Sequence, residues 1–245
     1  MHGGIKGRHI FSNAQPHVGK EMLANLDLSN FFPSTSQEIV CSALVRCGCS
    51  GLAAEKLAAL TMLDGGLPQG SPTSMIIGNL ALEKMDAKFM AIQHKHGFSY
   101  TRYVDDLTLS GKKQLKDFHP TFLSIIEKAG YSVSLKKMFY RGRNQPQIVT
   151  GLLVNETIRP TTEFIRELRW MLRQCWPEND GPVKVGVAEE MTVGELRRHL
   201  WGRIQFVRQM HPKLGQRTRA LMIKIQWNAA EIHGSSQINI IAARN

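Results

Sequence analysis

Cysteine is scarce in this 245-residue chain, and its spacing is unsuited to metal binding. The four cysteines are Cys41, Cys47, Cys49 and Cys175. No two of them have the CxxC spacing of a zinc site, and the pair separated by a single glycine is too close to hold a metal alone. The sequence therefore predicts reduced, mostly buried thiols, which suit a cytoplasmic protein.

Long apolar runs are also missing. The longest, residues 75–82, is interrupted by Gly78 and Asn79 and is far shorter than a membrane span. The first residues, MHGGIKGRHIF, contain no apolar segment of the kind found in signal peptides. We therefore expect a soluble protein with no membrane partner.

Acidic residues are outnumbered, because 31 Lys and Arg face 20 Asp and Glu and give a formal net charge of +11. The excess is uneven. Residues 136–245 hold 18 basic residues against 9 acidic ones, whereas residues 1–135 hold 13 against 11. Polyanions are therefore the first partners to consider, and the C-terminal part is expected to supply most of the positive field.

Local patterns predict a mixed α/β segment. Residues 22–28 have the composition of a buried strand, and residues 98–104 and 107–110 that of a hairpin with Asp105 and Asp106 at its turn. Helices are expected over residues 34–46, 52–63, 71–94 and 115–128, and short strands over 131–135, 138–140 and 148–154. In the second of these helices four leucines recur near helical spacing: Leu52, Leu57, Leu60 and Leu63.

From residue 161 onward the pattern is entirely helical. Residues 161–175 and 192–210 each place apolar residues on one side and arginines on another, and a third helix is expected over 214–230. The arginines singled out here are Arg166, Arg169 and Arg173 in the first helix and Arg197 in the second. A join between the two parts is predicted near residues 158–162.

Two adjacent acids, Asp105 and Asp106, need a physical explanation, because neighbouring like charges cost stability. An acidic, solvated turn is the common explanation of an isolated Asp-Asp pair, since Asp is frequent in turns. With Asp27, however, three carboxylates stand at the ends of expected strands. Mg²⁺ binds one or two carboxylates and keeps sites for phosphate oxygens, and two ions about 3.5 to 4 Å apart stabilise both oxygens of a phosphoryl displacement.

Three motifs occur in order along the chain: DLSNFF at residues 27–32, LPQGSPTS at 67–74 and YVDD at 103–106. In this order they resemble those of the reverse transcriptases, which are RNA-directed DNA polymerases. The resemblance implies an α+β, right-hand polymerase fold, with partial fingers and a palm of antiparallel sheet and helices, followed by an all-helical thumb. It also implies that Asp27, Asp105 and Asp106 bind two catalytic Mg²⁺ ions, with Mn²⁺ as a substitute.

The resemblance assigns contacts with the incoming deoxynucleotide. Phe32 would be an aromatic gate whose volume excludes a 2′-hydroxyl, while Phe31 is expected in the core. Gln69 would lie beside the nucleotide, with a polar turn residue that caps the next helix as the alternative. Gly70 would let the backbone approach closely.

Basic residues near the substrate are implied in the same way. Lys137 would lie near the triphosphate and protonate the leaving pyrophosphate, with Lys136 as the competing choice and a solvated basic pair as the alternative. Lys6 and Arg8 would touch template or triphosphate, although a flexible charged segment explains them equally well.

Two short elements narrow the family. NAQPH at residues 13–17 fits an NAxxH element and VTG at 149–151 fits a VTG element, and together they resemble those of retron-type bacterial reverse transcriptases. By this resemblance Asn13, His17, Val149, Thr150 and Gly151 are expected to contact nucleic acid. A lone histidine such as His17 is more often structural than functional.

The retron resemblance implies a partner and a product. Such enzymes recognise their own structured noncoding RNA, prime from an internal 2′-hydroxyl of a guanosine, and copy part of that RNA into covalently linked multicopy single-stranded DNA. They commonly act with an accessory effector in defence against phage. The arginine stripes suit a thumb, because guanidinium groups on a helix follow duplex phosphates without reading bases.

The expected domains are a residual fingers segment (1–24), a palm (25–159) with fingers-proximal helices (34–66), a basic helical thumb (160–232) and a C-terminal tail (233–245). The family carries more fingers sequence before the GRHIF segment, so either a truncated gene or fragment or a compact member with reduced fingers is expected. Val104 stands where retron enzymes usually have alanine and is expected to crowd the pocket beside the primer end.

Other functions stay open from sequence alone. A group II intron-like or diversity-generating reverse transcriptase is the nearest alternative. A palm-thumb protein that only binds RNA or scaffolds a toxin complex is the non-catalytic one. Three acids kept together without a metal would be costly, which argues against that scaffold.

Overall fold

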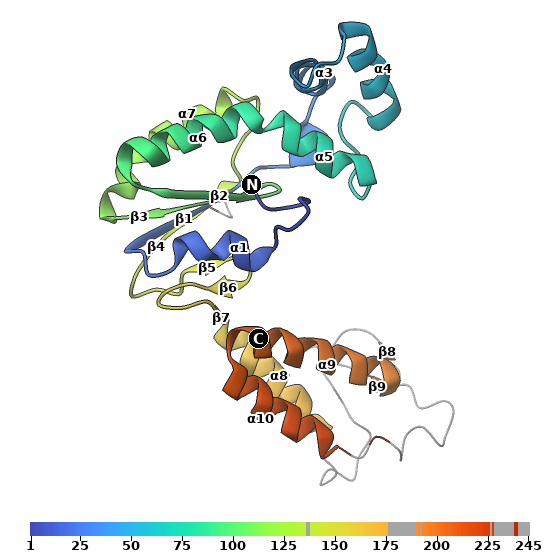
Figure 1. Cartoon of the computed structure of the whole chain (residues 1–245), viewed down its shortest axis with the longest axis vertical. Coiled ribbons are helices and arrows are strands. Elements are labelled where there is room, and N and C mark those ends of the chain that lie inside the picture. The colour runs from blue at the N-terminus through green and yellow to red at the C-terminus, as the bar shows by residue number, and fades with distance from the viewer. Residues whose placement is uncertain (136–137, 176–189, 192, 226, 228–237, 240–245) are drawn as a thin grey trace. The chain divides into compact units, whose positions relative to one another are not determined.

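The chain divides into two units, Met1–Ile158 and Arg159–Asn245, in the computed structural model (Figure 1). The structure describes residues 1–135, 138–175, 190–191, 193–225, 227 and 238–239. The helical elements of the first unit are α1 (Ile10–Ala14), η1 (Gln15–His17), α2 (Phe31–Ser34), α3 (Gln37–Arg46), α4 (Gly51–Thr61), α5 (Pro72–Ala81), α6 (Glu83–His96), η2 (Lys113–Phe118) and α7 (His119–Glu127). Its strands are β1 (Met22–Asp27), β2 (Ser99–Tyr103), β3 (Asp106–Gly111), β4 (Phe139–Gly142), β5 (Ile148–Val149) and β6 (Leu152–Leu153).

A four-stranded antiparallel sheet organises the first unit, in the order β2-β3-β1-β4. The expected strand at residues 22–28 is β1, which is buried from Met22 to Leu26 because strands pair with both of its edges. β2 and β3 form the expected hairpin. The α+β class with an antiparallel sheet is therefore confirmed.

The two faces of this sheet differ in polarity, because successive side chains of a strand point to opposite faces. On one face, Leu26, Leu107 and Leu109 pack in the main core with residues of α6 and α7 such as Phe89 and Phe122. Figure 1 shows α6 and α7 along one side of the sheet and α1 with the β5–β6 hairpin on the other. The second face carries mostly polar side chains: Asn25, Asp27, Thr101, Tyr103, Asp106, Thr108 and Ser110.

Two expected helices are divided in the structure. The segment 71–94 forms α5 and α6, which meet at the buried Leu82. α5 packs on α3 and lies against Phe31 through Gly78, whereas α6 packs on the sheet and α7, so one straight helix could not follow both supports. Likewise, the segment 115–128 forms η2 and α7, and the helix expected from residue 34 begins after an N-cap at Ser36.

The apolar residues of α4 lie on an unexpected side. Ala54 and Ala58 are buried in a small core with Val40 of α3, because their short side chains allow the two helices to approach closely. The leucines of the segment, by contrast, face outward, and Leu60 is 82% exposed. Leucine periodicity therefore predicted the helix correctly but not its buried face.

Three helices form the core of the second unit in the residues that the structure describes. Its elements are β7 (Arg159–Pro160), α8 (Thr162–Gln174), β8 (Glu190–Met191), α9 (Val193–Met210), α10 (Pro212–Ile223) and β9 (Ile238–Asn239). Leu168 and Met171 of α8, Leu200 and Ile204 of α9 and Met222 of α10 meet in one core. The apolar sides expected for the first two helices are thus confirmed.

All four cysteines are free, but only Cys175 is fully buried and Cys47 is exposed, so the expectation of mostly buried thiols was wrong. Burial raises the pKa of the Cys175 thiol to about 11, which keeps it protonated at neutral pH. In the part of the chain that the structure describes, no helix is both long and apolar enough to cross a membrane.

Candidate active site

Three acidic residues lie at one end of the four-stranded sheet. Asp27 ends β1 and is the cross-strand partner of Asp106, the first residue of β3. Residues directly opposite one another in an antiparallel pair project from the same face, so these two carboxylates share the polar face. Asp105 lies in the turn before β3, and its carbonyl oxygen accepts a 3.1 Å hydrogen bond from Leu28 N–H. The turn therefore consists of Val104 and Asp105, one residue earlier than predicted.

The donor set suits a divalent cation. Mg²⁺ prefers hard oxygen ligands and needs only one or two carboxylates from the protein. All three acids are partly exposed, and two of them are held opposite each other by paired central strands. Within the described residues, no three His, Cys, Asp or Glu side chains stand close enough to hold an ion as they are placed. The backbone register thus fits a Mg²⁺ site, while the side-chain positions do not yet form one.

Tyr103 lies at the same end of the sheet, and no role was predicted for it from sequence. It is the cross-strand partner of Asp106 on β2, so Tyr103, Asp106 and Asp27 form one row across three strands on one face. Its side chain is partly exposed. The YxDD spacing could have indicated this neighbour, because a two-residue turn pairs the residue before it with the residue after it.

A buried ion pair lies on the opposite face, and it too was missed. The Arg102 guanidinium donates from Nε and Nη2 to the two carboxylate oxygens of Asp86, at 2.9 and 2.7 Å. Tyr100 donates its hydroxyl to the same carboxylate at 2.6 Å. Burial alone would lower the pKa of the Arg102 guanidinium. The hydrogen bonds to Asp86 and the negative charge of Asp86 have the opposite, larger effect, so the pKa is raised. Burial, assisted by Asp86, raises the pKa of Tyr100 and keeps it neutral.

A sequence signal for this pair existed. Asp86 occupies position i+4 from Leu82 and follows Met85, and Phe89 comes three residues later, so the acid falls on the apolar side of the helix. An acid in that position needs a buried cationic partner. Arg102, which alternates with Tyr100 and Val104 on one face of the expected strand, was the available choice.

The two phenylalanines of DLSNFF differ in burial. Phe31 is 3% exposed and lies in the main core, as expected. Phe32 is half-buried, packs against two hydrophobic cores, and accepts a 2.9 Å hydrogen bond at its carbonyl from Leu67 N–H. The Phe32 ring is thus firmly supported and still accessible, which a sugar gate requires.

The LPQG segment forms a turn just before α5. Ser71 N–H donates to Pro68 O at 3.4 Å, and Gly70 has φ of +91° with no heavy atom within 4 Å of where a Cβ would lie. Glycine is therefore required here by backbone conformation rather than by crowding. Gln69 is exposed, and no side chain caps the start of α5, so the helix-capping alternative for Gln69 receives no support.

The basic residues expected near the substrate are placed only in part. Lys6 and Arg8 are exposed in the segment before α1. Lys136 and Lys137 lie outside the described residues.

Comparison with known proteins decides the family. A family model described as reverse transcriptase (RNA-dependent DNA polymerase) matches residues 2–148, which include all three acids. The chain belongs to the reverse transcriptase family. One structure of telomerase from Candida albicans, in complex with a fragment of telomeric RNA, matches 85% of this chain and 42% of that one with a TM-score of 0.50 at 13% identity, and supports the polymerase fold.

Curated relatives of this reverse transcriptase come from retrons. The retron Mx65 reverse transcriptase of Myxococcus xanthus is 31% identical over 236 residues, covering 88% of this chain and 52% of the relative. The retron Ec86 reverse transcriptase of Escherichia coli is 33% identical over 170 residues, covering 68% and 53%. The chain thus spans about half the length of these relatives. The retron resemblance expected from NAQPH and VTG is confirmed.

Within the NAQPH element, Asn13, Ala14 and His17 are buried, whereas Gln15 and Pro16 are exposed. His17 is 0% exposed and hydrogen bonds through Nδ1 to Ser110 Oγ at 2.7 Å and through Nε2 to Thr101 Oγ1 at 2.8 Å, which ties η1 to β3 and β2. Asn13 is also fully buried, and its carbonyl accepts from the Thr101 hydroxyl at 3.4 Å. Neither side chain reaches the surface, so burial gives no support to the expectation that Asn13 and His17 contact nucleic acid, and that expectation stays a prediction.

The hydroxyl groups of Ser110 and Thr101 suit a neutral His17 ring. A neutral imidazole has one donor and one acceptor nitrogen, and each of its two nitrogens here meets a hydroxyl that can take either role. Burial, with smaller effects of Lys20 and His2, lowers the pKa of His17 to about 3. The ring is therefore neutral throughout the physiological range.

This buried neutral histidine predicts a pH-dependent stability. Below its ordinary pKa of 6.5 the ring takes up a proton in the unfolded chain, whereas the folded ring stays neutral down to about pH 3. The free energy of unfolding should therefore be highest above pH 6.5. It should fall by up to about 1.4 kcal/mol per pH unit as the pH decreases toward 3. Urea unfolding followed by circular dichroism between pH 7.5 and 4.5 measures this slope.

His17→Gln should reduce the slope, whereas His94→Gln, which changes an exposed histidine, should not. Some slope should persist in either variant, because burial also lowers the pKa of His2 to about 4. A His17→Gln protein with the unchanged slope of the parent chain would contradict the assignment.

The VTG element is a tight hairpin turn. Val149 pairs with Leu152, so Thr150 and Gly151 form a two-residue loop between β5 and β6, with φ of 45° and 78°. Positive φ at both positions is the type I′ turn that matches strand twist. Val149 is fully buried, which excludes the expected nucleic-acid contact by its side chain, whereas Gly151 is exposed.

The predicted arginines of the second unit are all exposed. Arg166, Arg169 and Arg173, here called the α8 arginine row, follow one another along α8. Arg169 and Arg173 line a hollow of about 370 Å³ with Leu172 and Leu221.

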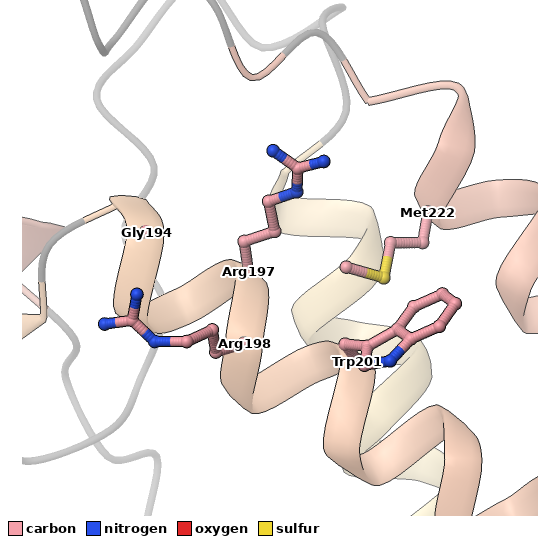
Figure 2. A pocket seen from close by; sticks show the side chains of 5 residues that line it. All are labelled: Gly194, Arg197, Arg198, Trp201 and Met222. Atoms are coloured by element: carbon pink, nitrogen blue, oxygen red, sulfur yellow. The ribbon is translucent and has the colours of Figure 1, made fainter.

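A second hollow, of about 480 Å³, lies between α9 and α10 (Figure 2). It is lined by Gly194, Arg197, Arg198, Trp201 and Met222. Figure 2 shows the Trp201 indole beside Met222, with Arg197 and Arg198 extending from α9 in different directions. Trp201 is 42% exposed and lies 5.5 Å from the Arg219 guanidinium. An accessible aromatic face is thus combined with several cations.

Proposed function

We propose that this chain is the RNA-directed DNA polymerase of a retron and copies a structured noncoding RNA into multicopy single-stranded DNA. The observation that supports this most directly is the β1–β3 register, which sets Asp27 opposite Asp106 with Asp105 in the adjoining turn. In a member of the reverse transcriptase family, this register brings the acids of two separate motifs to one end of one sheet.

In this proposal Asp27, Asp105 and Asp106 hold two Mg²⁺ ions, with Mn²⁺ as a substitute. Bound ions would stabilise negative charge on the attacking and leaving oxygens of nucleotidyl transfer. The protein's part is positioning: the strands carrying Asp27 and Asp106 are paired at the sheet centre, so their Cα atoms keep one register. Tyr103, next in the row, would bound the site on the β2 side.

The surrounding residues would select and orient the deoxynucleoside triphosphate. The Phe32 ring would lie against the sugar and exclude a 2′-hydroxyl by its volume. Gln69 and the Gly70 backbone would lie beside the nucleotide. Lys6 and Arg8 would contact template or triphosphate, and Lys137 would protonate the leaving pyrophosphate.

The domain roles follow the family pattern. Residues 1–24 would belong to the fingers, residues 25–159 to the palm with fingers-proximal helices at 34–66, and residues 160–232 to the thumb. Residues 233–245 would form the tail. The boundary between the two observed units, Ile158–Arg159, lies close to the proposed palm-thumb boundary.

The second unit would bind the structured RNA and its growing cDNA. The α8 arginine row and Arg197 supply guanidinium groups for phosphates, which position a duplex without reading its sequence. Trp201, accessible beside Arg197 and Arg198, is suited to stack on an unpaired base. Gly151, at the exposed tip of the VTG turn, would touch the same RNA through its backbone.

Neutralising the α8 arginine row should weaken RNA binding and flatten its salt dependence. Each lost phosphate contact is expected to reduce the slope of log K against log salt by about 0.7 to 0.9. Filter binding of the full chain to a structured RNA is measured at salt concentrations from about 50 to 300 mM. It gives both the affinity for RNA and the slope of log K against log salt.

A matched control changes the same charge at three exposed residues of this unit outside both hollows: Arg208, Lys213 and Arg217, each to Gln. If the control lowers the salt slope as much as the α8 variant, the α8 arginines are not a dedicated phosphate row.

The nucleic acid that the chain produces distinguishes the retron polymerase from the alternative functions. The chain is expressed with the RNA encoded beside its gene, and nucleic acid is isolated after RNase treatment. DNA joined to an RNA 2′-hydroxyl supports the retron polymerase. DNA without that branch would indicate a group II intron-like or diversity-generating enzyme, and RNA binding without DNA would indicate the scaffold. Phage plating with the neighbouring gene present tests the accessory effector.

A further inference from the structure

The turn that carries Asp105 has a strained backbone. Val104, its first residue, has φ of 61°, in the left-handed region. A β-branched side chain is a rare outlier there, and such conformations persist only where surrounding contacts hold them. Val104 directly precedes Asp105, so whatever holds Val104 also sets the direction of that acid.

The Arg102 guanidinium is the polar group that holds it. Nη1 donates to Val104 O at 2.6 Å and to Asn79 Oδ1 at 3.0 Å. Its other two nitrogens are occupied by Asp86, at 2.9 and 2.7 Å. Because the guanidinium is planar and held from two directions, the position of Nη1 is fixed, and with it the Val104 carbonyl.

The N-terminal segment closes the turn from outside. A Cβ on Gly3 would lie 2.5 Å from Val104 Cγ2 and 2.7 Å from Val104 N, so only glycine fits against the turn at this distance. Asn79 Nδ2 donates to Gly3 O at 2.9 Å, which places one amide side chain between Gly3 and Arg102. His2 N–H adds a 2.8 Å bond to Arg102 O.

We propose that Arg102 is a positioning residue that locks the acidic turn, with Asp86 orienting its guanidinium and with Asn79 and Gly3 bracing the turn. Nothing in the YVDD motif itself supplies this lock. Asn79 lies on α5, the helix that follows the Gln69-Gly70 turn, so the lock also joins that helix to the acids. Its meaning for catalysis rests on the proposed polymerase function, whereas the lock itself does not.

One amide reports the position of the turn independently of metal, substrate or activity. Leu28 N–H donates to Asp105 O across the end of the sheet. Ala24 and Leu109 lie opposite each other farther along the same strand pair and serve as internal references. Amide hydrogen exchange of the full chain, resolved by NMR, measures all three.

Arg102→Lys keeps a positive charge for Asp86 but cannot reach Asp86 and Val104 O together. Protection of the Leu28 amide should fall by about 10-fold or more while Ala24 and Leu109 keep theirs. Adding Val104→Gly should restore much of the protection, because glycine takes a positive φ without the cost that valine meets. Loss of protection at all three amides, or no loss at Leu28, would overturn the proposal.

Gly3→Ala tests the same lock without touching the buried charge, so it stays informative if Arg102→Lys fails to fold. It should lower Leu28 protection selectively, whereas Gly51→Ala, at the first residue of α4 with open space at its Cβ position and no positive φ, should not. Unchanged Leu28 protection in Gly3→Ala would refute the bracing contact. If the exchange pattern is as expected but the parent chain makes no DNA, the lock stands and the proposed function fails.

Discussion

Asp105→Ala should lower the rate of deoxynucleotide incorporation by about 1,000-fold or more. Metal-held carboxylates contribute several kcal/mol of charge stabilisation in the transition state, and each 1.4 kcal/mol, roughly, is a factor of ten in rate. Asp27→Ala and Asp106→Ala should be comparably damaging, because the strand register makes these two acids direct neighbours. Single-nucleotide incorporation on an RNA template with Mg²⁺ measures the three losses.

The matched control is Asp117→Ala, which removes an exposed carboxylate from η2 in the same unit. It should retain the activity of the parent chain. Circular dichroism of each variant separates loss of chemistry from loss of fold. DNA synthesis by Asp105→Ala at the parental rate would refute the assignment of the active site, although the chain would still belong to the reverse transcriptase family.

The three candidate acids could be selected from the sequence, but their arrangement in space could not be predicted from it. The order of DLSNFF, LPQGSPTS and YVDD resembles that of the reverse transcriptases, and this resemblance selects Asp27, Asp105 and Asp106. That Asp27 lies opposite Asp106, with Asp105 in the turn, depends on which strands pair and in which register. Register is set by burial of one sheet face and by turn length, which are tertiary properties.

The buried sides of the helices were likewise predicted only in part. Apolar spacing correctly predicted the buried side of α9, where Leu196, Leu200, Ile204 and Val207 are all in the core. The same rule failed on α4, because close packing through Ala54 and Ala58 turned the leucines outward. Periodicity therefore predicts a helix reliably, but neighbouring helices decide which side is buried.

Motif residues are not always contact residues. Asn13 and His17 were selected by a family pattern, yet both side chains are fully buried. The His17 ring and the backbone carbonyl of Asn13 hydrogen bond to the β2–β3 hairpin, which carries Asp105 and Asp106 at its turn. Conversely, Arg102 and Asp86 carry buried charge but belong to no motif that the sequence analysis used. A hydrogen-bond partner far away in sequence, such as Ser110 for His17, becomes visible only in the fold.

Asp86→Ala should destabilise the protein by about 3 to 5 kcal/mol, because it leaves the Arg102 guanidinium buried without its counter-charge. This is a large part of a typical total of about 5 to 15 kcal/mol. In a unit of this size, the melting temperature should fall by roughly 2 to 4 °C for each kcal/mol. Thermal and urea unfolding followed by circular dichroism measure the change.

Glu83→Ala is the control on the same helix. Its 3.8 Å pair with Arg46 is at the surface, and its loss should cost at most about 1 kcal/mol. Equal destabilisation by the two variants would show that the buried pair stabilises the protein no more than the surface pair does.

Replacing both partners separates stability from positioning. Asp86→Leu combined with Arg102→Met removes the uncompensated charge and should recover part of the stability lost in Asp86→Ala, since apolar substitutes for a buried pair are often nearly neutral. Recovery should be incomplete, because Tyr100 and Asn79 lose hydrogen-bond partners. Protection of the Leu28 amide should stay low in this double variant, because no donor reaches the Val104 carbonyl. If it returned with the stability, packing alone would hold the turn and Arg102 would be a structural residue.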